Sequence, residues 1–75
     1  MSGSEIYYLW MKIAEYVKNS DRDEALYVIL NDLLQNDEEL VMEFYDASIE
    51  DDNVDLMPLI RNFLIENELY EEEDW

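Results

Sequence analysis

Apolar residues recur at helical spacing along the whole chain, and very little interrupts them. The 75 residues include one glycine, Gly3, and one proline, Pro58, so the turn residues that separate short β-strands are nearly absent. No segment alternates apolar and polar residues in the way that a half-buried strand would. The pattern therefore predicts an all-α fold.

The first two predicted helices meet at Asn19-Ser20. Ser2 or Ser4 can cap the first helix, and Ser2 has capping-box spacing with Glu5. The inner face of this helix is predicted to consist of Ile6, Leu9, Trp10, Ile13, Tyr16 and Val17. Ser20 is expected to cap the second helix, and Asn36 is expected either to end it or to cap the next helix. Its apolar positions are Leu26, Ile29, Leu30, Leu33 and Leu34.

A third helix is predicted from Asp37 to about Ile49, with an inner face of Leu40, Val41, Phe44, Tyr45 and Ser48. Glu50-Asp51-Asp52-Asn53 reads as a turn. Pro58 must lie near the start of a fourth helix, because an interior proline would break it. The buried stripe of that helix would be Leu56, Leu59, Ile60, Phe63 and Leu64, with Leu69 and Tyr70 as an extension. We expect one domain over residues 1–75, a compact bundle of three to four short antiparallel helices with residues 71–75 frayed.

The residue types exclude most kinds of chemistry. The chain has no cysteine and no histidine, so disulfides, thiolate metal sites and the commonest catalytic bases and nucleophiles are missing. Asp51 to Asp55 opens like a calcium loop, but Leu56 replaces the glycine and Asn62 the final glutamate that such a loop requires. We therefore expect no catalytic residue, no metal and no cofactor.

The net charge of −17 is unevenly distributed. Residues 38–75 contain fourteen acids and one basic residue, Arg61, for a net charge of −13, whereas residues 1–37 carry −4. A chain that is 49% hydrophobic and 13% aromatic is nevertheless expected to fold, with its acids outside. A surface this negative would be repelled by nucleic acid and by the cytoplasmic face of a membrane. No stretch approaches the roughly 18 apolar residues that span a bilayer, and no secretory signal opens the chain.

Part of the charge forms a row on one predicted helical face. Glu39, Glu43, Asp46 and Glu50 are spaced four, three and four residues apart, with no lysine or arginine within four positions. Such a row places a carboxylate roughly every 5 Å, compared with a phosphate about every 3.4 Å along one DNA strand. The predicted contact surface consists of Glu39, Glu43, Asp46, Glu50, Asp51, Asp52 and Asp55, with Tyr45 and Trp75 as aromatic anchors beside it. If the last two helices are antiparallel, acids that include Glu66 and Glu68 could extend the negative surface.

In its small size, its acidity and its lack of catalytic groups, the chain resembles the acidic DNA-mimic proteins of phages and mobile elements. Anti-CRISPR, anti-restriction and glycosylase-inhibitor proteins belong to this class. The resemblance implies an inhibitor that acts in the cytoplasm of a bacterial host cell. Its partner would be a basic nucleic-acid-binding protein, such as a defence nuclease or its recognition complex.

Two other interpretations stay open. The chain could be another small acidic interaction module, such as an immunity protein, an antitoxin or a transcription regulator, with Tyr8 and Trp10 as apolar anchors. It could also be a domain from a salt-rich setting whose acids provide solubility. The aromatic cluster of residues 7–11 could be core, a partner contact or the contact of a homodimer.

Overall fold

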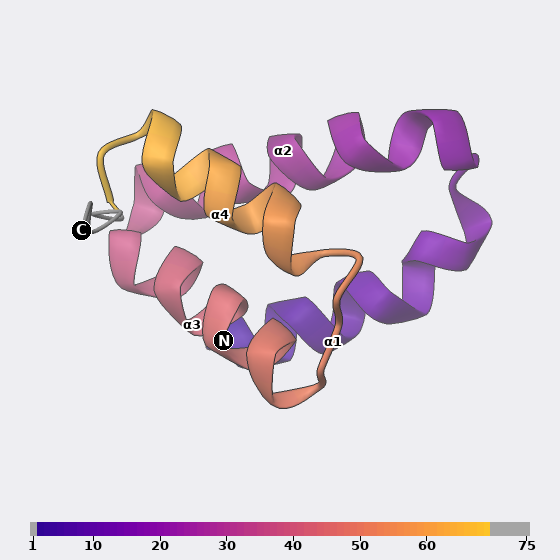
Figure 1. Cartoon of the computed structure of the whole chain (residues 1–75), viewed down its shortest axis with the longest axis horizontal. Helices are drawn as coiled ribbons and strands as arrows, with labels where there is room; N and C mark the ends of the chain where they lie inside the picture. The colour runs from indigo at the N-terminus through magenta and orange to yellow at the C-terminus, as the bar shows by residue number, and fades with distance from the viewer. Residues whose placement is uncertain (1, 70–75) are drawn as a thin grey trace.

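The computed structural model describes residues 2–69, and this part of the chain contains only helices and their connections. The elements are α1 (Gly3–Ile13), the 3-10 helix η1 (Ala14–Tyr16), α2 (Asn19–Asn36), α3 (Glu38–Glu50) and α4 (Met57–Glu66) (Figure 1). The predicted all-α bundle is therefore confirmed, with four α-helices in the described residues. Tyr70, the expected fraying of residues 71–75 and the proposed anchor Trp75 lie outside these residues.

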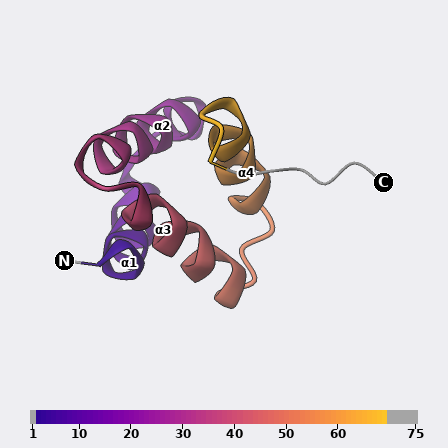
Figure 2. The same cartoon turned by 90° about the vertical axis from the view of Figure 1, so that its left-hand side faces the viewer.

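Helices that follow each other in the chain run antiparallel, whereas α1 and α3 lie side by side and run in the same direction (Figures 1 and 2). Helix α4 lies along the other side of the bundle, against α2 and α3. The parallel contact joins helices that are not neighbours in the sequence. Short connections predict antiparallel neighbours, but they give no information about this contact.

Side chains cap two of the helices, and the sequence predicts one of these caps, at Ser2. Ser2 Oγ accepts a hydrogen bond from the Glu5 amide at 3.2 Å, and Glu5 Oε1 accepts one from the Ser2 amide at 3.5 Å, so the capping box is confirmed. Asp37 Oδ1 accepts from the Glu39 amide at 3.0 Å at the start of α3. The expectation for Ser20 is wrong. Helix α2 begins at Asn19, and no side chain caps it.

Helices α3 and α4 both end in a Schellman motif with an acidic residue in the left-handed conformation. At the end of α3 this residue is Asp52, with φ of 52°, and the Asn53 amide donates to the Ser48 carbonyl at 2.9 Å. Helix α4 ends in the same way at Glu68, with φ of 60°. Helix α4 therefore stops before the suggested extension through Leu69, which instead packs partly buried against the core.

All four α-helices contribute to one hydrophobic core. The predicted inner faces of the last three helices are largely confirmed, since their most buried positions coincide with them. Ser48 is fully buried, and its hydroxyl donates to the carbonyl of Tyr45 within the same helix. The core side chains are Tyr7, Trp10, Leu26, Leu30, Leu33, Val41, Phe44, Tyr45, Ala47, Ile60, Phe63 and Leu64.

The predicted inner face of the first helix is correct at Trp10 and Ile6 but wrong at its other positions within α1 and η1. Leu9 is 47% exposed, Ile13 43% and Tyr16 84%, whereas Tyr7 is fully buried. The reason is that α1 packs on α3 through Gly3, which turns the face of Gly3, Tyr7 and Trp10 inward. Apolar residues occupy both candidate faces of this helix, so periodicity alone could not distinguish them.

Arg22 fixes the junction between α1 and α2. Its Nε donates to the carbonyl oxygens of Ala14 at 2.8 Å and Val17 at 3.1 Å. These carbonyls lie at the end of the α1–η1 segment, and the Ala14 oxygen also accepts from the Val17 amide at 3.1 Å. Within residues 2–69, no helix has both the length and the apolar character needed to cross a membrane.

Candidate partner-binding surface

The structure places Glu39, Glu43, Asp46 and Glu50, here called the acidic row, on the solvent face of α3. All four residues are exposed, and the buried residues of the helix lie on the opposite side. At a helical rise of about 1.5 Å per residue, the row is about 16 Å long. The side chains of Glu39, Asp46 and Glu50 make no hydrogen bond or ion pair within the described part of the chain. Their charge is therefore directed to solvent.

Glu43 differs from the rest of the row because it also holds two helices together. Its Oε1 accepts a hydrogen bond from the Gly3 amide at 3.1 Å, at the first turn of α1. A carboxylate at this position is favourable, because the first amides of a helix lack partners and carry partial positive charge. One edge of the row is thus part of the contact between α1 and α3.

The loop after α3 is joined to the core through Tyr7. The Tyr7 hydroxyl donates to Asp51 Oδ2 at 2.8 Å and accepts from Asn53 Nδ2 at 2.9 Å. Asn53 Oδ1 in turn accepts from the Leu56 amide at 3.2 Å. Burial raises the pKa of Tyr7 to about 12; the hydrogen bond and charge of Asp51 add to this rise, and Asn53 opposes it. Asp51 is exposed, but it also has a structural partner.

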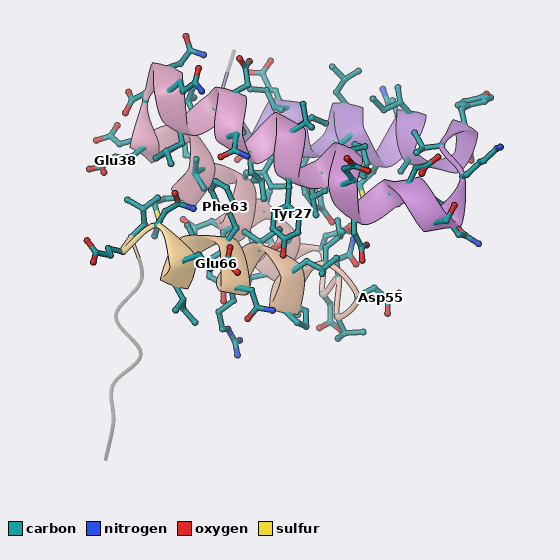
Figure 3. The ribbon with its side chains drawn as sticks, turned by 90° about the horizontal axis from the view of Figure 1, so that it is seen from above. Tyr27, Glu38, Asp55, Phe63 and Glu66 are labelled. Carbon is teal, nitrogen blue, oxygen red and sulfur yellow. The ribbon has the colours of Figure 1, made fainter. Side chains whose placement is uncertain are left out.

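The structure separates the remaining predicted loop carboxylates. Asp52 is exposed at the end of α3, two residues after Glu50. Asp55 instead lines a surface hollow with Trp10, Arg22 and Asp23, between α1, α2 and the start of α4. Figure 3 shows Asp55 far from Glu38, which lies at one end of the molecule. Asp55 therefore does not extend the row, because the chain turns toward α4 after Asp52.

At the other end of the row, two helices bring more carboxylates together. Glu38 and Glu39 at the start of α3 line one surface hollow with Glu68 at the end of α4. This cluster arises because α3 and α4 are antiparallel, so the end of one lies beside the start of the other (Figure 1). The sequence pattern predicts a contribution from Glu68 only if the last two helices are antiparallel, and Glu38 is not among the predicted contact residues. The helical hairpin pattern was the signal that could have identified both.

Two of the suggested aromatic anchors are wrong. Tyr45 is 7% exposed and Trp10 is 3% exposed, and both side chains pack in the core. Neither can insert into a partner without unfolding of the bundle. Tyr8 is 47% exposed and remains accessible. Its ring meets that of Tyr7 edge to face, with 5.1 Å between the ring centroids.

The contact between α2 and α4 is aromatic with an acidic border. The rings of Tyr27 and Phe63 lie 6.0 Å apart, and Tyr27 donates to the Leu59 carbonyl at 3.4 Å (Figure 3). Burial, followed by the charges of Glu66 and Asp23, raises the pKa of Tyr27. Glu66 faces this contact rather than the acidic row.

Within the described residues, no group of three or more carboxylates is arranged to hold a metal ion.

Comparison of the chain with protein-family models, curated proteins and solved structures finds no match. The fold and the surface define a small all-α protein whose carboxylates are concentrated along α3 and at its two ends.

Proposed function

We propose that this protein is an acidic DNA-mimic inhibitor, which occupies a basic nucleic-acid-binding surface of a host defence protein in the cytoplasm of a bacterial cell. A CRISPR effector and a restriction nuclease are partners of the appropriate kind. The observation that supports this proposal is the exposed acidic row on α3, with Glu38 and Glu68 at one end and Asp52 at the other. No lysine or arginine lies within four positions of the row in the sequence.

The physical basis of the proposal is the repulsion between the carboxylates of the acidic row, which no nearby lysine or arginine in the sequence neutralises. Like charges at helical spacing destabilise a helix by a few tenths of a kcal/mol per pair, so the row disfavours folding. A groove that binds the phosphate backbone carries lysine and arginine at spacings suited to a line of negative charge. A row about 16 Å long corresponds to about five phosphates of one strand, at about 3.4 Å each. Such a partner would relieve the repulsion and would attract the protein over a distance.

Within this surface the carboxylates have different expected roles. Glu39, Asp46 and Glu50 have no other partner in the described part of the chain and are the proposed direct contacts. Glu43 and Asp51 add negative charge while they hold α1 in place. Substitutions at the first group should affect binding alone, whereas substitutions at the second should affect both binding and folding.

A second candidate function is favoured by the exposed apolar residues of α1. Tyr8, Leu9 and Met11 are 47%, 47% and 38% exposed, and such side chains are typical anchors of protein interfaces. This observation would suit an immunity protein, an antitoxin or a transcription regulator that binds a basic partner. Such a protein would not need to compete with nucleic acid.

Competition with nucleic acid tests the proposal. The partner would first be captured from a bacterial lysate at low salt and eluted with a salt step, because the attraction is screened as salt rises. Binding of the purified partner is then measured with and without saturating DNA or RNA at fixed ionic strength. A DNA mimic should be displaced completely. Complex formation that is unchanged by saturating nucleic acid would refute DNA mimicry and favour the second candidate.

A charge-reversal pair locates the contact surface. Asp46→Lys with Glu50→Lys should weaken the complex at least about tenfold, or about 1.4 kcal/mol. Glu24→Lys with Asp32→Lys changes the net charge by the same amount on exposed positions of α2 and serves as the control. If both pairs weaken binding equally, net charge and not the acidic row governs the interaction.

A further inference from the structure

The α1–η1 segment carries most of the large apolar side chains that are exposed in the described residues. The described residues include eight exposed large hydrophobic side chains. Five of them belong to α1 and η1: Tyr8, Leu9, Met11, Ile13 and Tyr16. Soluble monomers rarely leave such a group uncovered. The buried side of α1 faces α3, so the exposed side points away from the acidic row. This surface is therefore separate from the proposed inhibitor surface.

The charge of this helix also differs from that of the rest of the molecule. The α1–η1 segment has two acids, Glu5 and Glu15, and one lysine, Lys12, for a net charge of −1. Residues 38–66 have nine acids and Arg61, for a net charge of −8. Two copies of the chain would repel each other least if they met through α1. A strongly basic partner, in contrast, would find more complementary charge on α3.

We propose that α1 is the contact of a homodimer, in which the two copies of the helix pack antiparallel about a twofold axis. Glu5, Tyr8, Leu9 and Lys12 share one outward face, because their spacings of three, one and three residues follow the helical period. Residues 5 and 12 are equidistant from the midpoint between residues 8 and 9. A twofold axis at that midpoint therefore places Glu5 opposite Lys12 of the partner subunit, and Lys12 opposite Glu5 of the partner subunit.

The same arrangement packs the apolar residues together. Tyr8 would lie against Leu9 of the partner subunit, and the reverse contact would repeat it across the axis. The face is thus complementary to itself in both charge and apolar character. Neither acidic row is covered, because α3 lies on the other side of α1. A second copy is therefore the occupant that fits this surface.

The mass of the isolated chain in solution, measured by sedimentation equilibrium across salt concentrations, tests this proposal. Raising salt from about 0.05 M to about 1 M shortens the Debye length from over 10 Å to about 3 Å, so the repulsion between copies weakens. The dimer dissociation constant should fall at least about tenfold. The proposed inhibitor complex should respond in the opposite direction, so the failure of one proposal is distinguishable from the failure of the other. A chain that stays monomeric up to about 1 mM at every salt concentration would overturn the dimer.

Variants identify the face that makes the contact. Tyr8→Ser with Leu9→Ser should raise the dissociation constant at least about a hundredfold, because it removes the apolar centre of the contact. Ile49→Ser with Val54→Ser is the matched control, since these side chains are also exposed, at 46% and 65%, but lie outside α1. Dissociation by the control alone would assign the dimer to another face and overturn the proposal.

Charge exchange tests the pairing itself. Glu5→Lys and Lys12→Glu should each weaken the dimer, and the double variant should restore it. Glu5→Lys makes the chain less negative, so a purely general charge effect would instead strengthen association. Failure of the double variant to restore the dimer would contradict the twofold pairing. Lys12→Glu leaves the Ser2–Glu5 capping box intact, so it still tests the pairing if Glu5→Lys does not fold.

Discussion

The hydroxyl of Tyr7 lies 2.8 Å from Asp51 Oδ2 and donates a hydrogen bond to it. Tyr7 is a fully buried residue of α1, and Asp51 is an exposed carboxylate at the end of α3. The bond therefore joins the core to the negatively charged surface. Together with Glu43 and Gly3, it fixes α1 along the side of α3. These contacts determine which acids are available to a partner and which also hold the fold.

Tyr7→Phe should reduce the free energy of unfolding by about 1–2 kcal/mol. The ring and its packing on Phe44 remain, so the loss reports the hydroxyl and its bonds to Asp51 and Asn53. Urea unfolding followed by circular dichroism measures it. Tyr8→Phe is the control, because the side chain of Tyr8 is half exposed. Equal effects of the two substitutions would show that the buried bonds add nothing.

The fold should lose stability at alkaline pH. Because burial raises the pKa of Tyr7 from 10.0 to about 12, the folded protein keeps a proton that the unfolded chain releases between these values. The free energy of unfolding should then fall as pH rises through that window, by up to about 2–3 kcal/mol. Urea midpoints at about pH 8 and about pH 11 measure roughly the first half of this loss, about 1.4 kcal/mol. The slope should be smaller in Tyr7→Phe, and an unchanged slope would contradict the assignment to Tyr7.

Gly3→Ala should destabilise the fold by at least about 2 kcal/mol. A Cβ at this position would lie 2.2 Å from the Leu40 carbonyl oxygen and 2.9 Å from the Phe44 amide nitrogen, and both are backbone atoms. Helix α1 would have to move away from α3, which also weakens the bond between Gly3 and Glu43. The stability of this variant is measured by thermal unfolding and compared with that of Ser4→Ala, one residue along the chain. We expect Ser4→Ala to change stability by less than about 0.5 kcal/mol. A stable Gly3→Ala variant would mean that the helices are not in such close contact.

Charge reversal should have opposite effects at two neighbouring positions of the acidic row. Glu43→Lys should cost about 1–2 kcal/mol, because it replaces the acceptor of the Gly3 amide with a positive charge at the start of a helix. Asp46→Lys should be neutral or stabilising by a few tenths of a kcal/mol, since it relieves repulsion. Glu43→Gln, which keeps an acceptor, should recover most of the loss. The sequence alone predicts that reversal at both positions raises stability; a stabilised Glu43→Lys variant would support that expectation against the structure.

Asp52→Gly should stabilise the protein by about 0.5–1.5 kcal/mol. Asp52 has φ of 52°, a conformation that disfavours side chains with a Cβ, and glycine is the usual residue at this position of a Schellman motif. Asp55→Gly removes the same charge from a residue without positive φ, so it should be neutral or destabilising. Chemical denaturation of both variants separates backbone strain from charge. Equal stabilisation by both would attribute the gain to reduced repulsion.

Much of the fold was predictable from local signals. The helical period identified the inner faces of α2, α3 and α4, because each of these helices has one apolar side. Ser2 with Glu5 marked the start of the first helix through hydrogen bonds that depend only on nearby residues, whereas Asp37 was expected inside α3 and instead caps it. The acidic row was predictable for the same reason, because the spacing of four acids within one helix does not depend on tertiary contacts. The predicted cap at Ser20 is wrong because nothing in the sequence shows that Asn19 already begins the helix.

The long-range contacts could not be predicted in this way. Tyr7 and Asp51 are 44 positions apart, and Gly3 and Glu43 are 40 positions apart, so no periodicity relates them. The parallel contact of α1 with α3 determined which side of α1 is buried, and it gave Glu43 a structural role. The antiparallel contact of α3 with α4 brought Glu38 and Glu68 together, while the turn after Asp52 directed Asp55 elsewhere.

Residue types and their spacing were enough to establish that the protein is helical, that it is acidic mainly in its second half, and that carboxylates line one face of α3. These properties depend on residue type and on spacing within one helix. The contacts between helices, in contrast, set the burial of Tyr7, the exposure of Leu9 and Ile13, and the division of the carboxylates into exposed and structural groups. Those outcomes depend on how close two backbones can approach, and Gly3 permits that approach only where it meets Leu40 and Phe44.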